Sequence, residues 1–262
     1  MRRPARSAIM GPEGAAWQVE PTAVEAADKA VFIPTLFDRI ARHYDLMNLL
    51  MTAGVWRLWQ RAFRRGAGIG PGQRVLDVGC GTAELSLLLA RLTGPAGAVV
   101  GVDVSAGMLA VGRRKVAASR AAARIELLEG DALALPFADG AFDAAASAFV
   151  MRNVADLDLA LREMARVVRP GGRIAVLELS HPTAPLVRGP FLFYFRRLLP
   201  LLGTWATRAG LPVAPYAWLP RSLETFPGAE AFAARLSAAG FAGVRFTRLS
   251  AGIVCLHTAL RP

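Results

Sequence analysis

A short glycine loop follows an apolar stretch and is flanked by acidic residues. Within residues 75–85, VLDVGCGTAEL, Gly79 and Gly81 have no side chain, so the backbone can pass close to a ligand. We expect Thr82 to cap the helix that follows and to offer its hydroxyl to the same ligand. A strand, a glycine turn and a helix in this order form a nucleotide-type site at the carboxyl edge of a sheet.

The residues of the loop indicate which nucleotide would fit. A dinucleotide-binding loop, G-x-G-x-x-G, has a third glycine or alanine at the position of Glu84 in this chain. A carboxylate there would repel a diphosphate, and Asp77, just before the first glycine, adds a second negative group. These acids favour a cationic ligand without phosphate. S-adenosylmethionine, which carries a sulfonium and an ammonium group, has this character.

Further acids are predicted at the ends of the next strands. Asp103 comes 22 residues after Gly81, where a carboxylate could accept hydrogen bonds from the two ribose hydroxyls. Asp131, next to Ala132, follows the third predicted strand and could accept from the adenine amino group. Ser147, on the fourth, would lie beside the methionine end. A single acidic residue at a strand end is usually solvated. Acidic residues at the ends of successive strands, together with the glycine loop, indicate a bound nucleoside.

The elements around these residues predict a doubly wound α/β fold. Strands that alternate with helices of this length are typical of a mostly parallel sheet with right-handed crossovers. Helices are expected at 83–92, 105–119, 157–168 and 229–239, and strands at 74–78, 99–104, 125–129, 142–149, 173–179, 244–248 and 253–260. The last two strands predict a C-terminal antiparallel hairpin, so the expected sheet is seven-stranded.

The length of the chain limits the number of domains. A chain of 262 residues, 54% of them hydrophobic, fits one domain with insertions better than two full domains. We predict a loose N-terminal arm over residues 1–30 and a single domain over 31–262. Helical cap elements are expected at about 36–65, which is rich in aromatic residues, and at about 186–209, where arginines interrupt an apolar stretch.

Composition disfavours several classes of function. The formal net charge of +11 comes from 31 basic residues, of which only Lys29 and Lys115 are lysines. The arginines are scattered rather than gathered in a stripe, so we expect no nucleic-acid partner, although the charge suits an anionic membrane surface. Cys80 and Cys255 are far apart and lack histidines at ligand spacing, so no metal site is expected. No apolar stretch is long enough to span a bilayer, and we expect a cytoplasmic protein that can contact a membrane peripherally.

Three segments carry a resemblance to a known family. With the glycine loop, they resemble the class I S-adenosylmethionine-dependent methyltransferases, and more narrowly the UbiE/MenG quinone C-methyltransferases. The second signature of that family matches residues 166–180, RVVRPGGRIAVLELS, and residues 151–154 resemble its Arg-Asn-Val turn. The first signature is similar to residues 44–48, YDLMN, but Thr52 stands in place of the usual serine and Trp56 in place of the usual histidine.

The resemblance implies a substrate and a set of contacts. The chain would use S-adenosylmethionine to methylate the ring carbon of a prenylated hydroquinone, either demethylmenaquinol or a ubiquinol precursor. The fold would be the sheet of the class I methyltransferases, with its C-terminal hairpin and a helical cap. By the same resemblance, cofactor contacts fall on Thr82, Asp103, Asp131, Ala132 and Ser147.

Methylation of a ring carbon suggests which residues are catalytic. A hydroquinone becomes nucleophilic at carbon when a ring hydroxyl, with a pKa of about 10, loses its proton. Arg152, at the end of the fourth predicted strand, could favour the phenolate, Asn153 could orient the group bound there, and Tyr44 lies in a predicted lid. As alternatives, Arg152 is only a structural ion-pair partner and Tyr44 only fills the cap core. For the whole chain, the alternatives are a methyltransferase for another lipid, phenolic or RNA acceptor, and a non-catalytic nucleoside-binding module. The sequence does not indicate the oligomeric state.

Overall fold

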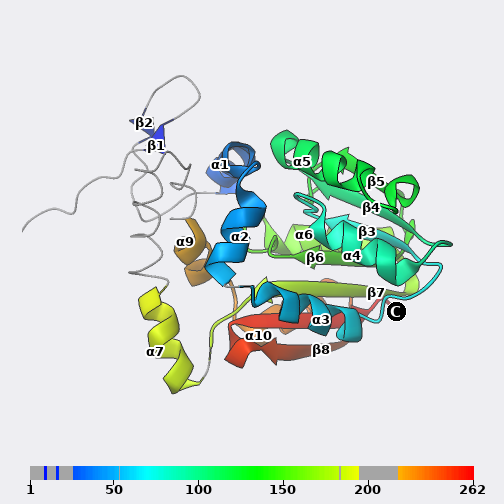
Figure 1. Cartoon of the computed structure of the whole chain (residues 1–262). Coiled ribbons are helices and arrows are strands. Elements are labelled where there is room, and N and C mark those ends of the chain that lie inside the picture. Colours follow the sequence, from blue (N-terminus) through cyan, green and yellow to red (C-terminus); the bar gives the residue numbers. More distant parts are fainter. Residues whose placement is uncertain (1–8, 11–15, 18–25, 53, 183, 195–217) are drawn as a thin grey trace, which may run out of the picture.

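A seven-stranded sheet runs through the centre of the computed structural model, which describes residues 9–10, 16–17, 26–52, 54–182, 184–194 and 218–262 (Figure 1). The strand order is β5-β4-β3-β6-β7-β9-β8. The first five strands in this order are parallel, and β9 pairs antiparallel with both β7 and β8. The strands are β3 (Arg74–Val78), β4 (Ala98–Asp103), β5 (Ile125–Glu129), β6 (Phe142–Ala148), β7 (Val168–Leu179), β8 (Ala242–Leu249) and β9 (Val254–Leu260). The predicted mostly parallel sheet with a C-terminal hairpin is confirmed.

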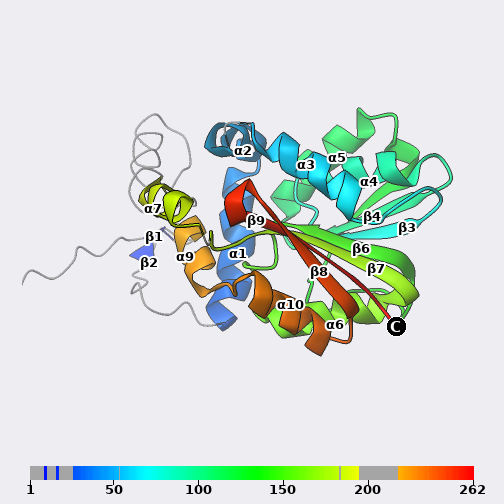
Figure 2. The same ribbon diagram turned by 90° about the horizontal axis from the view of Figure 1, so that it is seen from below.

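Helices cover both faces of this sheet, because the central strands are apolar on both sides and must be buried on both. One face packs against α3 (Trp56–Gly66), α4 (Glu84–Thr93) and α5 (Ala106–Ala117). The other packs against α6 (Leu157–Val167) and α10 (Ala229–Ala238). Figure 2 shows the two layers on opposite sides of the sheet. This arrangement is the predicted doubly wound fold.

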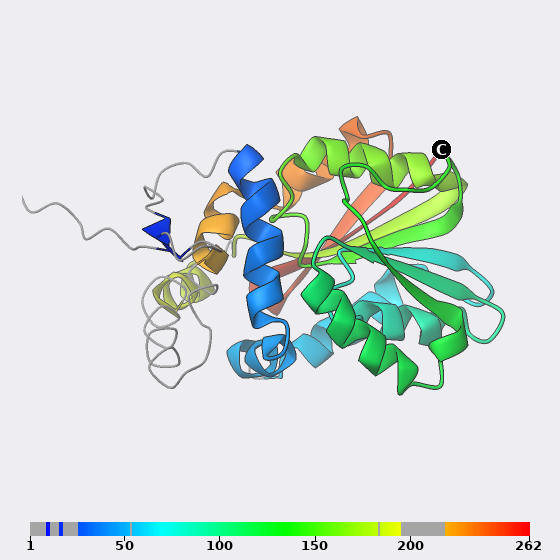
Figure 3. The ribbon, with the colours of Figure 1, turned by 90° about the horizontal axis from the view of Figure 1, so that it is seen from above.

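Within the described ranges, four further helices gather beyond the carboxyl ends of the parallel strands. They are α1 (Ala26–Ile40), α2 (Tyr44–Thr52), α7 (Pro185–Phe193) and α9 (Trp218–Thr225). Figure 3 shows α1 lying across that end of the sheet. Asp38 fastens α1 to α5, because its Oδ1 accepts hydrogen bonds from Ser105 Oγ at 2.6 Å and from Gly107 N at 2.8 Å. No helix among these and the other described residues has the length and apolar character that a membrane crossing requires.

The cap elements agree in part with their prediction. The aromatic stretch 36–65 is helical, but it divides into the end of α1, α2 and α3, with Gly54 at a φ of +75° between the last two. Of the range 186–209, helix α7 covers the first part, and residues 195–209 lie outside the described residues. Within the predicted N-terminal arm, β1 (Ile9–Met10) pairs with β2 (Ala16–Trp17), and α1 already begins at Ala26.

Two local predictions are wrong. Strand β7 begins at Val168 rather than at residue 173, because a shift of register against β6 accommodates the Pro-Gly-Gly segment within the strand instead of in a loop. Thr82 does not cap α4: the N-cap is Ala83, with a left-handed φ of 64° and no capping side chain. Ser105 caps α5, since its Oγ accepts from Met108 N at 3.1 Å.

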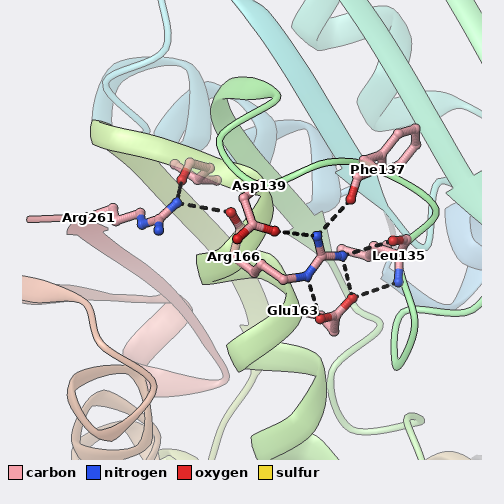
Figure 4. A network of polar contacts seen from close by, with 7 residues as sticks. Leu135, Phe137, Asp139, Glu163, Arg166 and Arg261 are labelled. Atoms are coloured by element: carbon pink, nitrogen blue, oxygen red, sulfur yellow. Dashed lines mark hydrogen bonds and ion pairs between the residues drawn. The ribbon is translucent and has the colours of Figure 1, made fainter.

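A network around Arg166 fixes the loop between β5 and β6 (Figure 4). The guanidinium donates to the carbonyl oxygens of Leu135 at 2.9 Å and Phe137 at 2.7 Å. Glu163 pairs with the same guanidinium at 2.7 Å and accepts from Leu135 N at 2.9 Å. This loop begins after Glu129, the last residue of β5, and includes Asp131. Arg166, from the second family signature, therefore helps to fix the loop that carries a predicted cofactor residue.

Candidate active site

The glycine loop has a backbone shape that favours glycine. Gly79 and Gly81 have φ values of +72° and +52°, which residues with a side chain rarely adopt. A Cβ on Gly79 would come within 2.3 Å of Val150 Cγ2. The loop lies against the end of β4, where the amides of Gly79 and Cys80 donate to Val102 O at 2.7 and 3.0 Å. The backbone is therefore held close to whatever occupies the cleft above it.

Asp103 holds this loop in place. Its Oδ2 accepts from Gly81 N at 2.8 Å, and its Oδ1 accepts from Ser105 N at 2.9 Å. Burial raises the pKa of the Asp103 carboxyl, because a buried charge has lost its hydration. Hydrogen bonds from a ligand, or a positive charge beside it, would favour the ionised form.

A cavity of about 120 Å³ opens beside Asp103, and we call it the donor cavity. It lies between the glycine loop, the ends of β4 and β5, and the inner side of α1. Asp131 is fixed at its wall, because Leu133 N donates to Asp131 Oδ1 at 2.9 Å. Of the predicted cofactor residues, the structure brings five together along this cavity: Gly79, Gly81, Asp103, Asp131 and Ala132. Two carboxylates beside a glycine backbone that lines the cavity suit a nucleoside that carries positive charge.

Asp77 and Ser147 lie below the loop rather than in the donor cavity. Ser86 Oγ donates to Asp77 Oδ2 at 2.6 Å, while Asp77 Oδ1 is buried without a hydrogen-bond partner in the described part of the chain. Burial raises the pKa of Asp77 to about 7, so it supplies less negative charge than the sequence suggested. Ser147 Oγ donates to Val78 O at 2.8 Å. Both side chains tie neighbouring elements together beneath the site.

A second and larger cavity, of about 680 Å³, lies on the other side of the glycine loop, and we call it the acceptor cavity. Its walls come mainly from α2, α3, the end of α7 and the carboxyl end of β7. They are mostly apolar, and include Leu49, Met51, Trp56, Trp59, Phe63, Leu85, Leu88, Leu177, Leu179, Phe191 and Ile253. Thr52 and Trp56, the two departures from the first family signature, both line it.

The two cavities meet along a shared wall. Tyr44, Gly79, Gly81, Ala148 and Phe149 line both of them. The phenol of Tyr44 hydrogen-bonds with the side chain of Asn48, and burial raises the pKa of Tyr44 above its usual value. Tyr44 therefore keeps its proton at neutral pH. A group in the donor cavity and a molecule in the acceptor cavity would approach each other at this wall.

Arg152 forms part of the wall of the acceptor cavity and is ion-paired behind it. Its Nη1 lies 2.5 Å from Glu178 Oε1 and donates to Phe149 O at 2.9 Å. Its Nε is buried and has no partner among the described residues. The structure thus shows the ion-pair role of Arg152, while its catalytic role stays a prediction. Glu178 lies in the matched signature, but sequence reasoning did not select it.

Asn153, the next residue, belongs to the other cavity. It lines the donor cavity, and its Oδ1 accepts from Trp218 Nε1 at 2.9 Å. The structure therefore does not bring Asn153 to the part of the acceptor cavity that Arg152 lines, where it was expected to orient a bound group. Its amide instead connects the turn after β6 to α9.

A polar cluster missed by sequence reasoning joins α2 to the glycine loop. Thr82 Oγ1 donates to Asp45 Oδ1 at 2.7 Å. Lys115 Nζ lies 2.5 Å from Asp45 Oδ2 and 2.7 Å from Glu84 Oε1. Thr82 is thus held at the rim of the acceptor cavity, and Glu84 is paired with a lysine. The only available signal was that Lys115 is one of two lysines in an arginine-rich chain.

Comparisons with known proteins agree with this geometry. The model of the ubiE/COQ5 methyltransferase family matches residues 24–261. A demethylmenaquinone methyltransferase from Symbiobacterium thermophilum is 41% identical over 236 residues, which are 89% of this chain and 94% of that protein. A ubiquinone/menaquinone biosynthesis C-methyltransferase UbiE from Hahella chejuensis is 40% identical over 91% of this chain and 94% of that protein.

Solved structures show the same fold at low sequence identity. A SAM-dependent methyltransferase from Aquifex aeolicus superposes with a TM-score of 0.57 at 17% identity, over 92% of this chain and 100% of the other. A SAM-dependent methyltransferase from Thermotoga maritima gives a TM-score of 0.59, also at 17% identity, over 88% of this chain and 100% of the other. At these identities the similarity is one of fold alone.

Proposed function

The chain belongs to the ubiE/COQ5 methyltransferase family, and we propose that it transfers a methyl group from S-adenosylmethionine to a ring carbon of a prenylated hydroquinone. A non-catalytic nucleoside-binding module does not fit a member of this family. The products named for its relatives, menaquinone and ubiquinone, suggest demethylmenaquinol or a ubiquinol precursor as the acceptor.

The observation that carries the proposal is the junction of two unlike cavities. The donor cavity presents the carboxylates of Asp103 and Asp131, whereas the acceptor cavity is large and mostly apolar. The first suits a nucleoside with a positively charged sulfur, and the second suits an aromatic ring with a hydrocarbon tail. Gly79 and Gly81 line both cavities, so a methyl donor in the first and an acceptor ring in the second would lie close together at this wall.

The residues of the donor cavity would bind S-adenosylmethionine, which supplies a methyl group on a sulfonium. Asp103 would accept from the ribose hydroxyls and Asp131 from the adenine amino group. The glycine loop would let its backbone approach the methionine part without a clash. Because Asp103 and Asp131 are fixed by backbone amides before any ligand arrives, little reorganisation is needed on binding.

Arg152 would raise the reactivity of the acceptor. A guanidinium beside a ring hydroxyl lowers the pKa of that phenol and places electron density on the neighbouring ring carbon. With S-adenosylmethionine as methyl donor, the phenol would release its proton to solvent and the ring carbon would take the methyl group, while the electron pair of the broken carbon–sulfur bond stays on sulfur. The proton of that ring carbon would then return to the ring oxygen. Tyr44 is protonated at neutral pH, so it would serve as a hydrogen-bond donor and not as the base. The apolar walls would exclude water.

We also propose that the enzyme acts as a peripheral protein at a membrane surface. A prenylated hydroquinone is insoluble in water, and it would reach the acceptor cavity from a lipid phase. The chain would otherwise be cytoplasmic.

Deletion of the gene tests the proposed reaction. Quinones extracted from the deletion strain should contain the demethylated form in place of the methylated one. A gene carrying Glu129→Gln should restore the methylated quinone, and one carrying Asp103→Asn should not, because Glu129 lies at the end of neighbouring β5 but outside both cavities. An unchanged quinone profile would favour another lipid, phenolic or RNA acceptor.

A further inference from the structure

Exposed apolar side chains concentrate on three helices around one cavity. Isolated exposed leucines are common on protein surfaces, but a gathered set usually marks an interaction site. Among the described residues, six large apolar side chains are exposed, and only one of them, Leu260, lies away from α2, α3 and α7. The other five are Leu46, Leu49, Leu58, Leu186 and Phe193. Figures 2 and 3 show the three helices on the same side of the molecule.

Two of these helices, α3 and α7, are basic. Helix α3 carries four exposed arginines and no acidic residue, and α7 carries one exposed arginine and no acidic residue. These arginines are Arg57, Arg61, Arg64, Arg65 and Arg188. The one acidic residue of α2, Asp45, is paired with Lys115. The exposed leucines therefore lie near arginines whose charge no unpaired acidic residue of these three helices neutralises.

The acceptor cavity opens onto this surface. Leu49 and Arg57 are exposed and also line the cavity, and Phe191 of α7 lines it from the other side. Helix α7 is connected to α2, because Tyr194 Oη donates to Met51 O at 3.2 Å. The residues at the rim of the cavity and those of the exposed surface thus come from the same elements.

We propose that α2, α3 and α7 form a docking surface for an anionic lipid bilayer. Their exposed leucines and Phe193 would enter the boundary between headgroups and acyl chains, and the arginines would bind lipid phosphates. The mouth of the acceptor cavity then faces the membrane, so that an acceptor passes from bilayer to cavity without crossing water. This last step rests on the proposed function, whereas docking itself does not.

Flotation with vesicles tests the docking surface. The full chain should bind vesicles of phosphatidylcholine mixed with phosphatidylglycerol and should bind phosphatidylcholine alone much more weakly. Changing Arg61, Arg64 and Arg65 to Gln should weaken binding to the mixed vesicles roughly 100-fold. Changing three other exposed arginines, Arg91, Arg114 and Arg120 on or beside α4 and α5, removes the same charge elsewhere and should have little effect.

A second pair of variants, a test and a control, measures how much the exposed apolar side chains contribute to vesicle binding. Leu58→Ser with Leu186→Ser should reduce binding to mixed vesicles, and Leu260→Ser should not. The proposal is overturned if the wild-type chain binds neither vesicle, if it binds both equally, or if the test and control variants lose binding alike. The last result would mean that net charge alone governs adsorption.

A soluble acceptor separates docking from the proposed reaction. The docking variants avoid both cavities, so each should methylate a short-chain, water-soluble demethylquinol as fast as the wild type. If the wild type does not methylate this acceptor, the proposed reaction fails, while the vesicle result still decides the docking surface. If the docking variants also lose turnover on the water-soluble acceptor, their substitutions impair the reaction itself and the docking assignment is wrong.

Discussion

Arg152 and Glu178 form a buried ion pair in which Nη1 lies 2.5 Å from Oε1. Arg152 is 8% exposed and Glu178 is 1% exposed. Glu178 Oε1 also accepts from Leu179 N at 2.8 Å, so the carboxylate has a fixed position on β7. The pair therefore anchors a cation in the wall of the acceptor cavity while the Nε hydrogen of Arg152 stays without a partner among the described residues.

The substitution Arg152→Lys separates a catalytic from a structural role. A lysine can keep the ion pair with Glu178, but all its donors are on one nitrogen, so it cannot hold Glu178 and present a separate nitrogen to a ring oxygen as a guanidinium can. We expect the affinity for S-adenosylmethionine to stay within about twofold while kcat falls about 100-fold, a typical loss for removal of one charge-stabilising donor. Calorimetry and single-turnover measurements would test this. The same change at Arg245, exposed on β8, is the control. If Arg152→Lys turns over normally, Arg152 acts only as an ion-pair partner.

Asp103→Asn should impair cofactor binding, because an amide offers one acceptor oxygen where the carboxylate uses two. The loop amide or the ribose would lose its partner, and the negative charge beside the donor cavity would be lost. We expect the dissociation constant for S-adenosylmethionine to rise about 100-fold, since hydrogen bonds to charged groups contribute about 1.5–3 kcal/mol. Glu129→Gln, one strand further along the sheet, should change it little. Equal affinities for wild type and Asp103→Asn would place the cofactor elsewhere.

Asp77 should make stability depend on pH. Its pKa is about 7 in the folded chain, against about 3.9 when unfolded. Between these values the folded state retains a proton that the unfolded state has released. The free energy of unfolding should therefore fall as pH rises through this window, by up to about 1.4 kcal/mol per pH unit.

The variant Asp77→Asn isolates this effect, because an amide resembles the protonated acid and can still accept from Ser86. Urea unfolding at several pH values should give a flatter pH dependence for the variant than for the wild type. Parallel curves for the two proteins would mean that Asp77 does not hold a proton in this range.

The pairing of Lys115 with Asp45 should slow cofactor release, because it holds α2 against the glycine loop. We expect Lys115→Met to accelerate dissociation of S-adenosylmethionine a few-fold, in line with the roughly 1 kcal/mol of a partly exposed ion pair. Salt should accelerate dissociation from the wild type and have less effect on the variant, since it screens this pair. Stopped-flow displacement measures both rates, with Arg114→Met as the neighbouring control. Identical rates and salt dependence would show that the pair does not restrain α2.

Local signals predicted most of the fold and about half of the site. The sequence identified Gly79, Gly81 and Asp103 because each follows or ends a predicted strand. Such residues can be placed at the carboxyl edge of a parallel sheet from the sequence alone. The role of Asp77 could not be predicted, because the burial of its carboxyl depends on packing from both faces of the sheet.

Partners that are distant in sequence could not be predicted. Asp45 and Lys115 meet only because α2 folds over the glycine loop, and Glu178 reaches Arg152 only because β6 and β7 are adjacent. Asn153 was expected to act with its neighbour Arg152. The tight turn after β6 instead sends the two consecutive side chains to different cavities, and no sequence pattern specifies that divergence.

The most direct test of the account is the fate of a labelled methyl group. The chain would be incubated with S-adenosylmethionine carrying a ¹³C-methyl group and with a reduced short-chain demethylquinol, and the product examined by NMR. The account predicts one labelled methyl on a ring carbon, with much less product from the Asp103→Asn variant at the same concentration of S-adenosylmethionine. A label on a ring oxygen, or an unlabelled quinol despite bound S-adenosylmethionine, would contradict it.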